Sequence, residues 1–186
     1  MNDRRPKFLA LLRGINVGGK NVIPKDALKQ CFEDQGFRSV RTYIQSGNVL
    51  FRSEQTSAKD LTATIEQALS DRFSYAARSV VLSERRYKAA IDAAPDGWGR
   101  NEDQKHNALF TLAGYSPKRA MAQLPSPKEE IERVTAGPGV IFWSVSKQHL
   151  TRTRYMKLAA APIIYRQLTI RNHNTVYKLL SLFDEI

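Results

Sequence analysis

The residues best suited to bind a ligand follow a short apolar run, Phe8 to Leu12, near the start of the chain. Glycine is entropically expensive, and its use is to adopt positive φ or to let a ligand approach the backbone. Backbone N–H groups beside basic side chains are what a phosphate or another anion needs. The loop is therefore predicted to bind an anion. Its candidate ligands are Arg13, Gly14, Asn16, Gly18, Gly19 and Lys20.

The segment from Gly14 to Asn21 matches the P-loop spacing GxxxxGK, which leaves three interpretations open. A true ATPase needs a magnesium-binding Ser or Thr where Asn21 stands, and its lysine opens the helix directly, whereas here Pro24 begins it later. A phosphate or nucleotide loop without hydrolysis needs neither feature. A purely structural loop would use its glycines for a crossover turn and pack Arg13 on Tyr43.

Two further segments carry amides and small residues at predicted turns. Ser46, Gly47 and Asn48 form a tight turn between two apolar runs, which is typical of a hairpin. Asn172 and Asn174 precede an apolar-periodic run, where N-cap chemistry accounts for one of them. Arg171 beside a helix N-terminus would suit a phosphate. As a lone histidine, His173 is interpreted as a hydrogen-bonding surface residue.

Periodicity predicts an α+β fold. In the first half the elements alternate as βαββαβ, the order of ferredoxin-like domains. They are a strand at 7–12, a helix from Pro24 to Gly36, strands at 40–44 and 49–52, a helix at 58–73 and a strand at 78–82. The strand order 4-1-3-2 of that fold makes strands one and three antiparallel neighbours. We therefore expect Arg13–Asn16, Ser46–Asn48 and Arg78 to meet at one edge of the sheet.

The element order repeats after residue 106 without sequence identity between the halves. The pattern predicts strands at 107–113, 130–135, 140–145 and 168–170, and helices at 117–123, 151–160 and 173–183. The segment Pro127–Glu130 could instead begin a helix. We expect two ferredoxin-like halves, with helices on one face of each antiparallel sheet and an extra C-terminal helix. The predicted division is a domain at 1–94, a linker at 95–105 and a domain at 106–186.

Charge favours an anionic partner. The 186 residues carry a net charge of +11, and no Asp or Glu occurs from Arg133 to Phe183. Solubility charges normally mix signs, so this span predicts either contacts to phosphate or simply a solvated basic face. Trp143, Tyr155, Tyr165 and Tyr177 offer rings for stacking on bases, although aromatics at such spacings are more often core.

The remaining composition predicts a cytoplasmic protein. Cys31 is the single cysteine, which suits a reducing compartment, and no apolar run of about 18 residues predicts a membrane span. The first residues predict no secretory leader. His106, His149 and His173 lack metal-site spacing, so no metal site is predicted, and the sequence names no cofactor and no oligomeric state.

The function predicted from these observations is anion binding, with a nucleic acid or a nucleotide or phosphate ligand as the partner. Two alternatives stay open. One is an enzyme acting on a phosphorylated small molecule at the edge formed by Arg13 and Ser46. The other is a protein-interaction module whose sheets pair edge to edge.

Three segments resemble a widespread bacterial family catalogued as a domain of unknown function (number 1697). They are Leu11–Asn21, Arg41–Val49 and Thr169–Val176, and the resemblance extends over nearly the whole chain. It implies a cytoplasmic protein with two ferredoxin-like halves and brings no activity, substrate or cofactor. The family usually has Trp where His173 stands and often Met where Pro24 stands.

Overall fold

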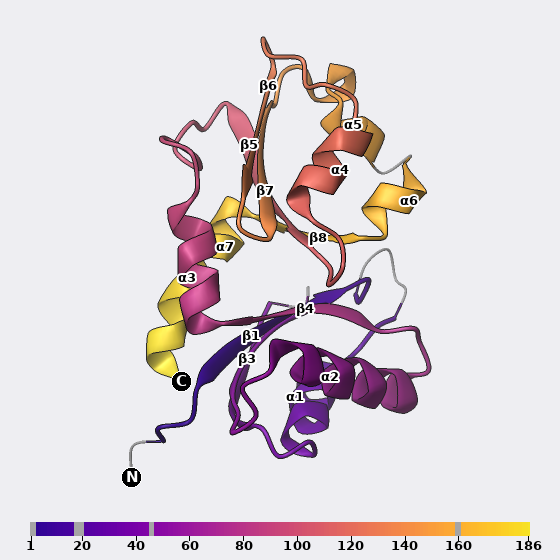
Figure 1. The fold of residues 1–186 in the computed structure, drawn as a ribbon, viewed down its shortest axis with the longest axis vertical. Coiled ribbons are helices and arrows are strands. Elements are labelled where there is room, and N and C mark those ends of the chain that lie inside the picture. Colours follow the sequence, from indigo (N-terminus) through magenta and orange to yellow (C-terminus); the bar gives the residue numbers. More distant parts are fainter. Residues whose placement is uncertain (1–2, 17–20, 45–46, 159–160) are drawn as a thin grey trace. The chain divides into compact units, whose positions relative to one another are not determined.

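The computed structural model describes residues 3–16, 21–44, 47–158 and 161–186. Within these residues the chain forms two four-stranded antiparallel sheets (Figure 1). The chain divides into two compact units. The first holds residues 1–87 together with Leu179–Ile186, and the second holds Lys88–Lys178.

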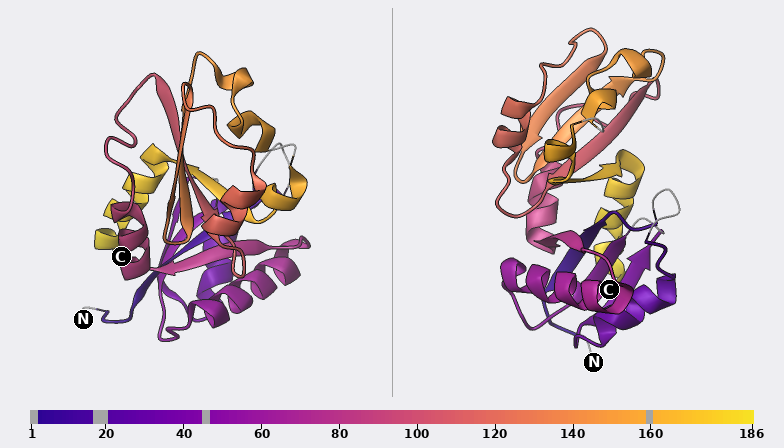
Figure 2. Two further views of the ribbon diagram at one scale, coloured as in Figure 1. Left: turned by 45° about the horizontal axis from the view of Figure 1, so that its top comes forward. Right: turned by 90° about the vertical axis from the view of Figure 1, so that its right-hand side faces the viewer.

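The first unit has the βαββαβ order predicted from the sequence. Its strands follow the order β2-β3-β1-β4, which is the ferredoxin-like arrangement. Figure 2 shows both of its helices on the same side of the sheet. The elements are β1 (Lys7–Arg13), α1 (Lys25–Glu33), β2 (Arg38–Tyr43), β3 (Asn48–Arg52), α2 (Ala58–Phe73) and β4 (Arg78–Ser83).

The core of the first unit lies between the sheet and its helices. Alternate residues of β1, such as Phe8, Ala10 and Leu12, point into it and are at most 2% exposed. Leu61, Ile65 and Leu69 of α2 recur at helical spacing and meet them. The Ser57 hydroxyl accepts a hydrogen bond from the Asp60 backbone N–H and caps the start of α2.

The second unit repeats this topology, with strands in the order β6-β7-β5-β8. Residues from α4, α5 and α6 pack on one face of its sheet against Leu109, Ile141 and Trp143. Its elements, with the two helices that continue into the first unit, are α3 (Glu84–Asp92), β5 (Gln104–Thr111), α4 (Pro117–Gln123), β6 (Glu132–Gly137), β7 (Val140–Ser146), η1 (Leu150–Arg152), α5 (Tyr155–Leu158), α6 (Pro162–Tyr165), β8 (Leu168–Asn172) and α7 (His173–Leu182).

The prediction of one continuous helix at 151–160 is wrong: among the described residues the chain forms two separate short turns there, η1 and α5, and α6 follows them. The Thr153 hydroxyl donates a hydrogen bond to the Leu150 carbonyl, and η1 ends there. The Arg154 backbone N–H then bonds the carboxylate of buried Glu132 rather than a helical carbonyl. Pro162 begins α6 separately, since proline is favoured in a first turn.

The last residues of the chain return to the first unit as η2 (Phe183–Glu185). Phe183 is fully buried, with its ring centroid 5.8 Å from that of Tyr87. Lys7 Nζ donates to the Phe183 carbonyl at 2.5 Å, and Arg52 donates to the Ile186 main-chain oxygen at 2.7 Å. The C-terminal segment is therefore an integral part of the first core.

No helix in the described ranges is long and apolar enough to cross a membrane.

Candidate functional site

The two glycine-bearing turns of the first unit meet at one end of its sheet. The Leu12 backbone N–H donates to the Gly47 carbonyl at 2.7 Å, and Leu11 lies opposite Asn48 in the ladder. A Cβ placed on Gly47 would lie 2.8 Å from Leu12 Cβ and 2.9 Å from Ile15 Cδ1. The juxtaposition predicted from the strand order is confirmed for these residues. We call this end of the sheet, with Arg13, Gly14, Gly47 and Arg78, the glycine rim.

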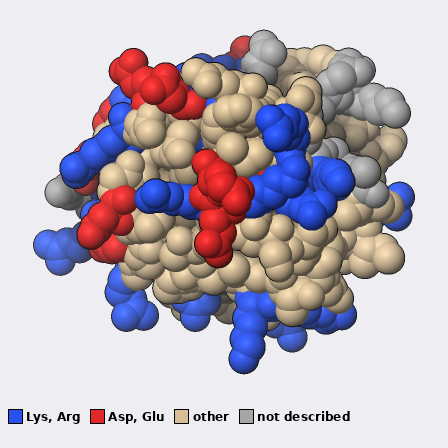
Figure 3. Space-filling model, turned by 90° about the horizontal axis from the view of Figure 1, so that it is seen from above, with Lys and Arg blue, Asp and Glu red and all other residues tan. Residues whose placement is uncertain are grey.

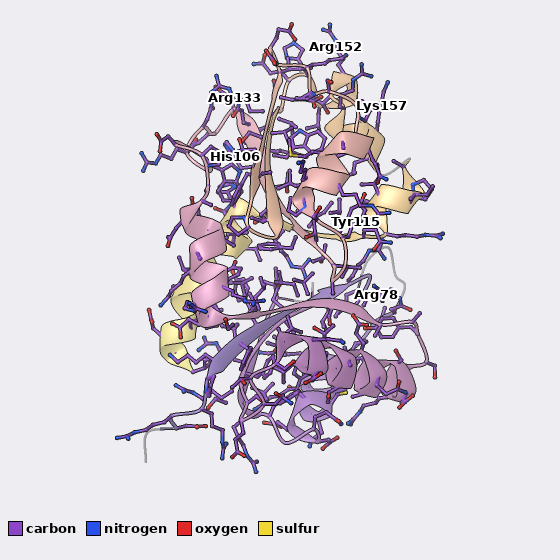
Figure 4. All side chains as sticks on the ribbon, viewed as in Figure 1. Arg78, His106, Tyr115, Arg133, Arg152 and Lys157 are labelled. Atoms are coloured by element: carbon purple, nitrogen blue, oxygen red, sulfur yellow. The ribbon has the colours of Figure 1, made fainter. Side chains whose placement is uncertain are left out.

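Two arginines face each other at the glycine rim. Arg13 is the last residue of β1 and lies directly opposite Arg78, the first residue of β4. Arg78 is half exposed, and its Nε lies 3.8 Å from a Glu66 carboxylate oxygen (Figure 4). That same oxygen accepts a hydrogen bond from the Ser79 backbone N–H at 2.7 Å. The Glu66 carboxylate therefore lies beside the positive charge of Arg78 and is anchored to the backbone of β4.

The asparagines of the loop brace its backbone. Asn16 accepts a hydrogen bond from the Ile23 N–H at 2.8 Å and donates to the Ile23 carbonyl at 3.3 Å. Asn21 donates to the Gly14 carbonyl at 2.8 Å. Both asparagines have positive φ, which Asn tolerates better than most residues. The side chain of Asn16 therefore binds both backbone groups of Ile23, a role that the sequence did not indicate.

Asn48 also stabilises the fold. It is fully buried, and its amide donates to the Tyr43 carbonyl at 3.0 Å across the hairpin. Gly14 is exposed, with φ of +74°. The predicted ligands Gly18, Gly19, Lys20 and Ser46 lie outside the described residues, so the P-loop interpretation and the role of Ser46 stay predictions.

The third predicted group lies in the second unit. Arg171 is buried in β8, and its Nη1 donates to the Thr169 hydroxyl and to the Ile170 carbonyl, both at 2.8 Å. Asn172 accepts from the Thr175 N–H at 2.8 Å, which is the N-cap bond expected for one of the two asparagines. Asn174 is exposed on the first turn of α7. The phosphate role predicted for these three residues stays a prediction.

A polar cavity that the sequence did not indicate lies on the second sheet, on the face away from α4 (Figure 4). It has a volume of about 270 Å³ and is bounded by β5, β6, β7 and the segment 95–101. The side chains that line it include Trp98, His106, Arg133, Thr135, Phe142 and Ser144. Trp98 forms one wall and meets Phe142 edge to face, with ring centroids 5.0 Å apart.

Three polar residues stand in one row across that sheet. Arg133 of β6 is the cross-strand partner of Ser144 of β7, and Ser144 is in turn the partner of His106 of β5. His106 Nδ1 lies 2.8 Å from the Ser144 hydroxyl, and His106 Nε2 lies 2.9 Å from the Asn101 carbonyl. A carbonyl only accepts, so Nε2 carries the proton, and Nδ1 of the neutral ring accepts from Ser144.

Burial disfavours the charged form of His106. Only 3% of the residue is exposed, and desolvation lowers the pKa of its imidazole below the ordinary 6.5. The bond to the Asn101 carbonyl opposes this shift in pKa, while His173 and Lys147 add to it. His173 stands edge-on to His106 with ring centroids 5.5 Å apart, and Trp98 stands edge-on to both rings.

Sequence reasoning missed this row because its members are far apart in the chain. His106 and Ser144 are separated by 38 positions. Ser144 is one polar residue inside an apolar strand, and His106 lies in a polar run just before the strand predicted at 107–113. The hairpin prediction for 130–145 was the signal available, but the register of β5 against β7 was needed to bring the residues together.

The acid-free span does not produce an acid-free surface. Figure 3 shows Lys and Arg gathered in a band across the face that it draws, with Asp and Glu side chains among them. Glu129 and Glu130, just before the span, are exposed.

No group of three or more His, Cys, Asp or Glu side chains could hold a metal ion in the part of the chain that the structure describes.

Comparison with known proteins places the chain in a family. Residues 6–142 match the family described as "Protein of unknown function (DUF1697)". The chain belongs to this family. It is also similar to the structure of a conserved bacterial protein from Streptococcus pneumoniae, with 30% sequence identity and a TM-score of 0.83. That match covers 95% of this chain and 98% of the other. No curated protein matches the sequence. Neither description names an activity, so the family membership fixes the fold and leaves the ligand to be argued from the site.

Proposed function

We propose that this protein is an anion-binding module that holds a phosphate-bearing ligand, a nucleotide or a nucleic acid, at the glycine rim. The observation that carries the proposal is the pair of arginines at the rim, Arg13 directly opposite Arg78. The net charge of +11 would attract such a partner over a longer range.

The local geometry supports an anion between the arginines. A Glu66 carboxylate oxygen lies 3.8 Å from Arg78 Nε and also accepts the Ser79 N–H, so the carboxylate is shared between Arg78 and the backbone. The Gly47 turn lies against Leu12 and Ile15, which brings backbone with no Cβ to the same end of the sheet. A phosphate here would relieve the repulsion of the two guanidinium groups and accept charge-assisted hydrogen bonds.

The test measures binding of inorganic phosphate, a nucleoside monophosphate and a single-stranded RNA oligonucleotide by calorimetry. Arg13→Gln and Arg78→Gln should each weaken the binding about tenfold or more, since a hydrogen bond to a charged group contributes roughly 1.5–3 kcal/mol. Arg38→Gln is the matched control. It removes the same charge from an exposed position at the opposite end of β2.

Each result bears on the proposal. Binding lost in the rim variants and kept in Arg38→Gln supports a local site. Equal losses in all three variants would mean that only the overall charge matters. A steep fall of RNA affinity with salt, absent for the monophosphate, would identify nucleic acid as the ligand. Failure of the wild-type protein to bind any of the three anions would refute the proposal.

A further inference from the structure

We propose that Ser144 and His106 form a nucleophile–base pair that hydrolyses a small carboxylic ester in the cavity of the second unit. This site shares no residue with the glycine rim, so the two proposals stand or fall separately. The proposal rests on the row Arg133–Ser144–His106, which three adjacent strands hold in direct register.

The row contains the parts that nucleophilic catalysis requires. A serine must lie within hydrogen-bond reach of a base, and a third group must orient that base. Here the Ser144 hydroxyl is 2.8 Å from His106 Nδ1, and the Asn101 carbonyl at 2.9 Å fixes the tautomer that leaves Nδ1 free to take a proton. The strands are rigid elements, so these positions are held without a substrate.

Arg133 supplies the charge on the other side of the serine. Residues directly opposite in an antiparallel pair have Cβ atoms about 5 Å apart, so Arg133 and His106 are the two cross-strand neighbours of Ser144. Positive charge at this place would stabilise the oxyanion that forms when a carbonyl is attacked.

The cavity favours a short, neutral ester over a phosphate. Its volume of about 270 Å³ lies just below the range of ordinary ligand sites, which limits the acyl group to a short chain. Exposed Asp96 lines it together with Arg133, so the lining carries charge of both signs. A doubly charged phosphate would meet that carboxylate, whereas an ester acquires negative charge only in the transition state. Trp98 and Phe142 provide apolar walls for the acyl chain.

The reaction balances with water as the only co-reactant. Ser144 Oγ attacks the ester carbonyl carbon while its proton passes to His106 Nδ1. The carbon–oxygen bond to the leaving group then breaks, and that proton goes to the departing alkoxide. In the second half, His106 takes a proton from water, the hydroxide attacks the acyl-serine, and the proton returns to Ser144 Oγ. The products are a carboxylic acid and an alcohol.

The chain contains a matched control for this chemistry. Ser146 lies two residues further along β7, and its hydroxyl is 3.2 Å from His149 Nδ1. Its partner across the ladder is Gln104, not a basic residue. Ser146 and His149 therefore form a serine–histidine contact outside the row with Arg133.

The test is covalent labelling of the full chain with an ethyl fluorophosphonate, followed by peptide mapping. Serine displaces fluoride from this reagent with the same proton transfer to the base. We expect the adduct on Ser144, no adduct in Ser144→Ala, and an unchanged rate in Ser146→Ala. His106→Gln should label about 100-fold more slowly, which is the usual contribution of a general base.

Circular dichroism of each variant separates loss of chemistry from loss of fold. If His106→Gln does not fold, Arg133→Gln at an exposed position gives the second test and should label about tenfold more slowly. A wild-type protein that acquires no adduct would overturn the proposal. So would an adduct on Ser146, or labelling that persists in Ser144→Ala.

Discussion

Replacing Gly47 with alanine tests the contact between the two glycine-bearing turns. Gly47 has φ of +76°, and an added Cβ would lie 2.8 Å from Leu12 Cβ and 2.9 Å from Ile15 Cδ1. Positive φ alone costs a residue with a Cβ roughly 1–2 kcal/mol. Overpacking adds about 1–3 kcal/mol. We therefore expect Gly47→Ala to lower the free energy of unfolding by roughly 2–5 kcal/mol.

Gly14→Ala is the matched control, because Gly14 has φ of +74° and, among the described residues beyond its chain neighbours, none has an atom within 4 Å of the added Cβ. Gly14→Ala should lower the free energy of unfolding only by the cost of positive φ, roughly 1–2 kcal/mol. Urea unfolding followed by far-ultraviolet circular dichroism measures both variants. Tryptophan fluorescence would miss the effect, since Trp98 and Trp143, the two tryptophans of the chain, lie in the second unit. Equal losses in the two variants would refute the close packing of the turns.

Three other outcomes follow from the buried groups. Phe183→Ala should destabilise the first unit by about 3–5 kcal/mol, because the fully buried ring leaves a cavity beside Tyr87; a loss under about 1 kcal/mol in urea unfolding would contradict the role of the C-terminal segment. Burial raises the pKa of Glu132 above 4.5, so the folded state binds more protons and stability should fall as pH rises through that window; Glu132→Gln should flatten this slope in urea titrations. Burial lowers the pKa of His106 below 6.5, so stability should instead be lost as pH falls below 6.5, and His106→Gln should remove that loss.

Local patterns in the sequence were sufficient for most of the fold. Helical spacing of Leu61, Ile65 and Leu69 predicted a helix at 58–73, and α2 has these bounds. The helix predicted at 117–123 likewise has the bounds of α4, which Ser116 caps. These elements are fixed by caps and periodicity, which neighbouring residues alone determine. The segment at 151–160 failed because the deciding partner, Glu132, comes from another strand.

The candidate sites were harder to predict than the fold, because most of their contacts join residues that are far apart in the sequence. The glycine rim was predictable because strand order alone brings Gly47 to Leu12. The sequence could not show that the side-chain amides of Asn16 and Asn48 form hydrogen bonds to the backbone. An asparagine that binds a ligand and one that stabilises a turn are the same residue in the sequence. The Ser144–His106 contact depends on a register between distant strands.

The two units share one strand arrangement, but the polar residues of the candidate sites lie at opposite ends of the respective sheets. In each, a glycine with positive φ accepts a backbone N–H from the end of the first strand: Gly47 from Leu12, and Gly139 from Thr111.

Counting along the ladders from these glycines aligns His106 and Ser144 with Lys7 and Arg52. In the first unit this pair of positions holds the C-terminal segment, through Lys7 to Phe183 and Arg52 to Ile186. In the second unit the same positions line a cavity. Conversely, the place of Arg13 is taken by Leu112, whose N–H bonds the Gln167 carbonyl. A shared backbone with separate polar rows is consistent with halves that repeat in element order but not in sequence, and it gives the two proposed sites different residues.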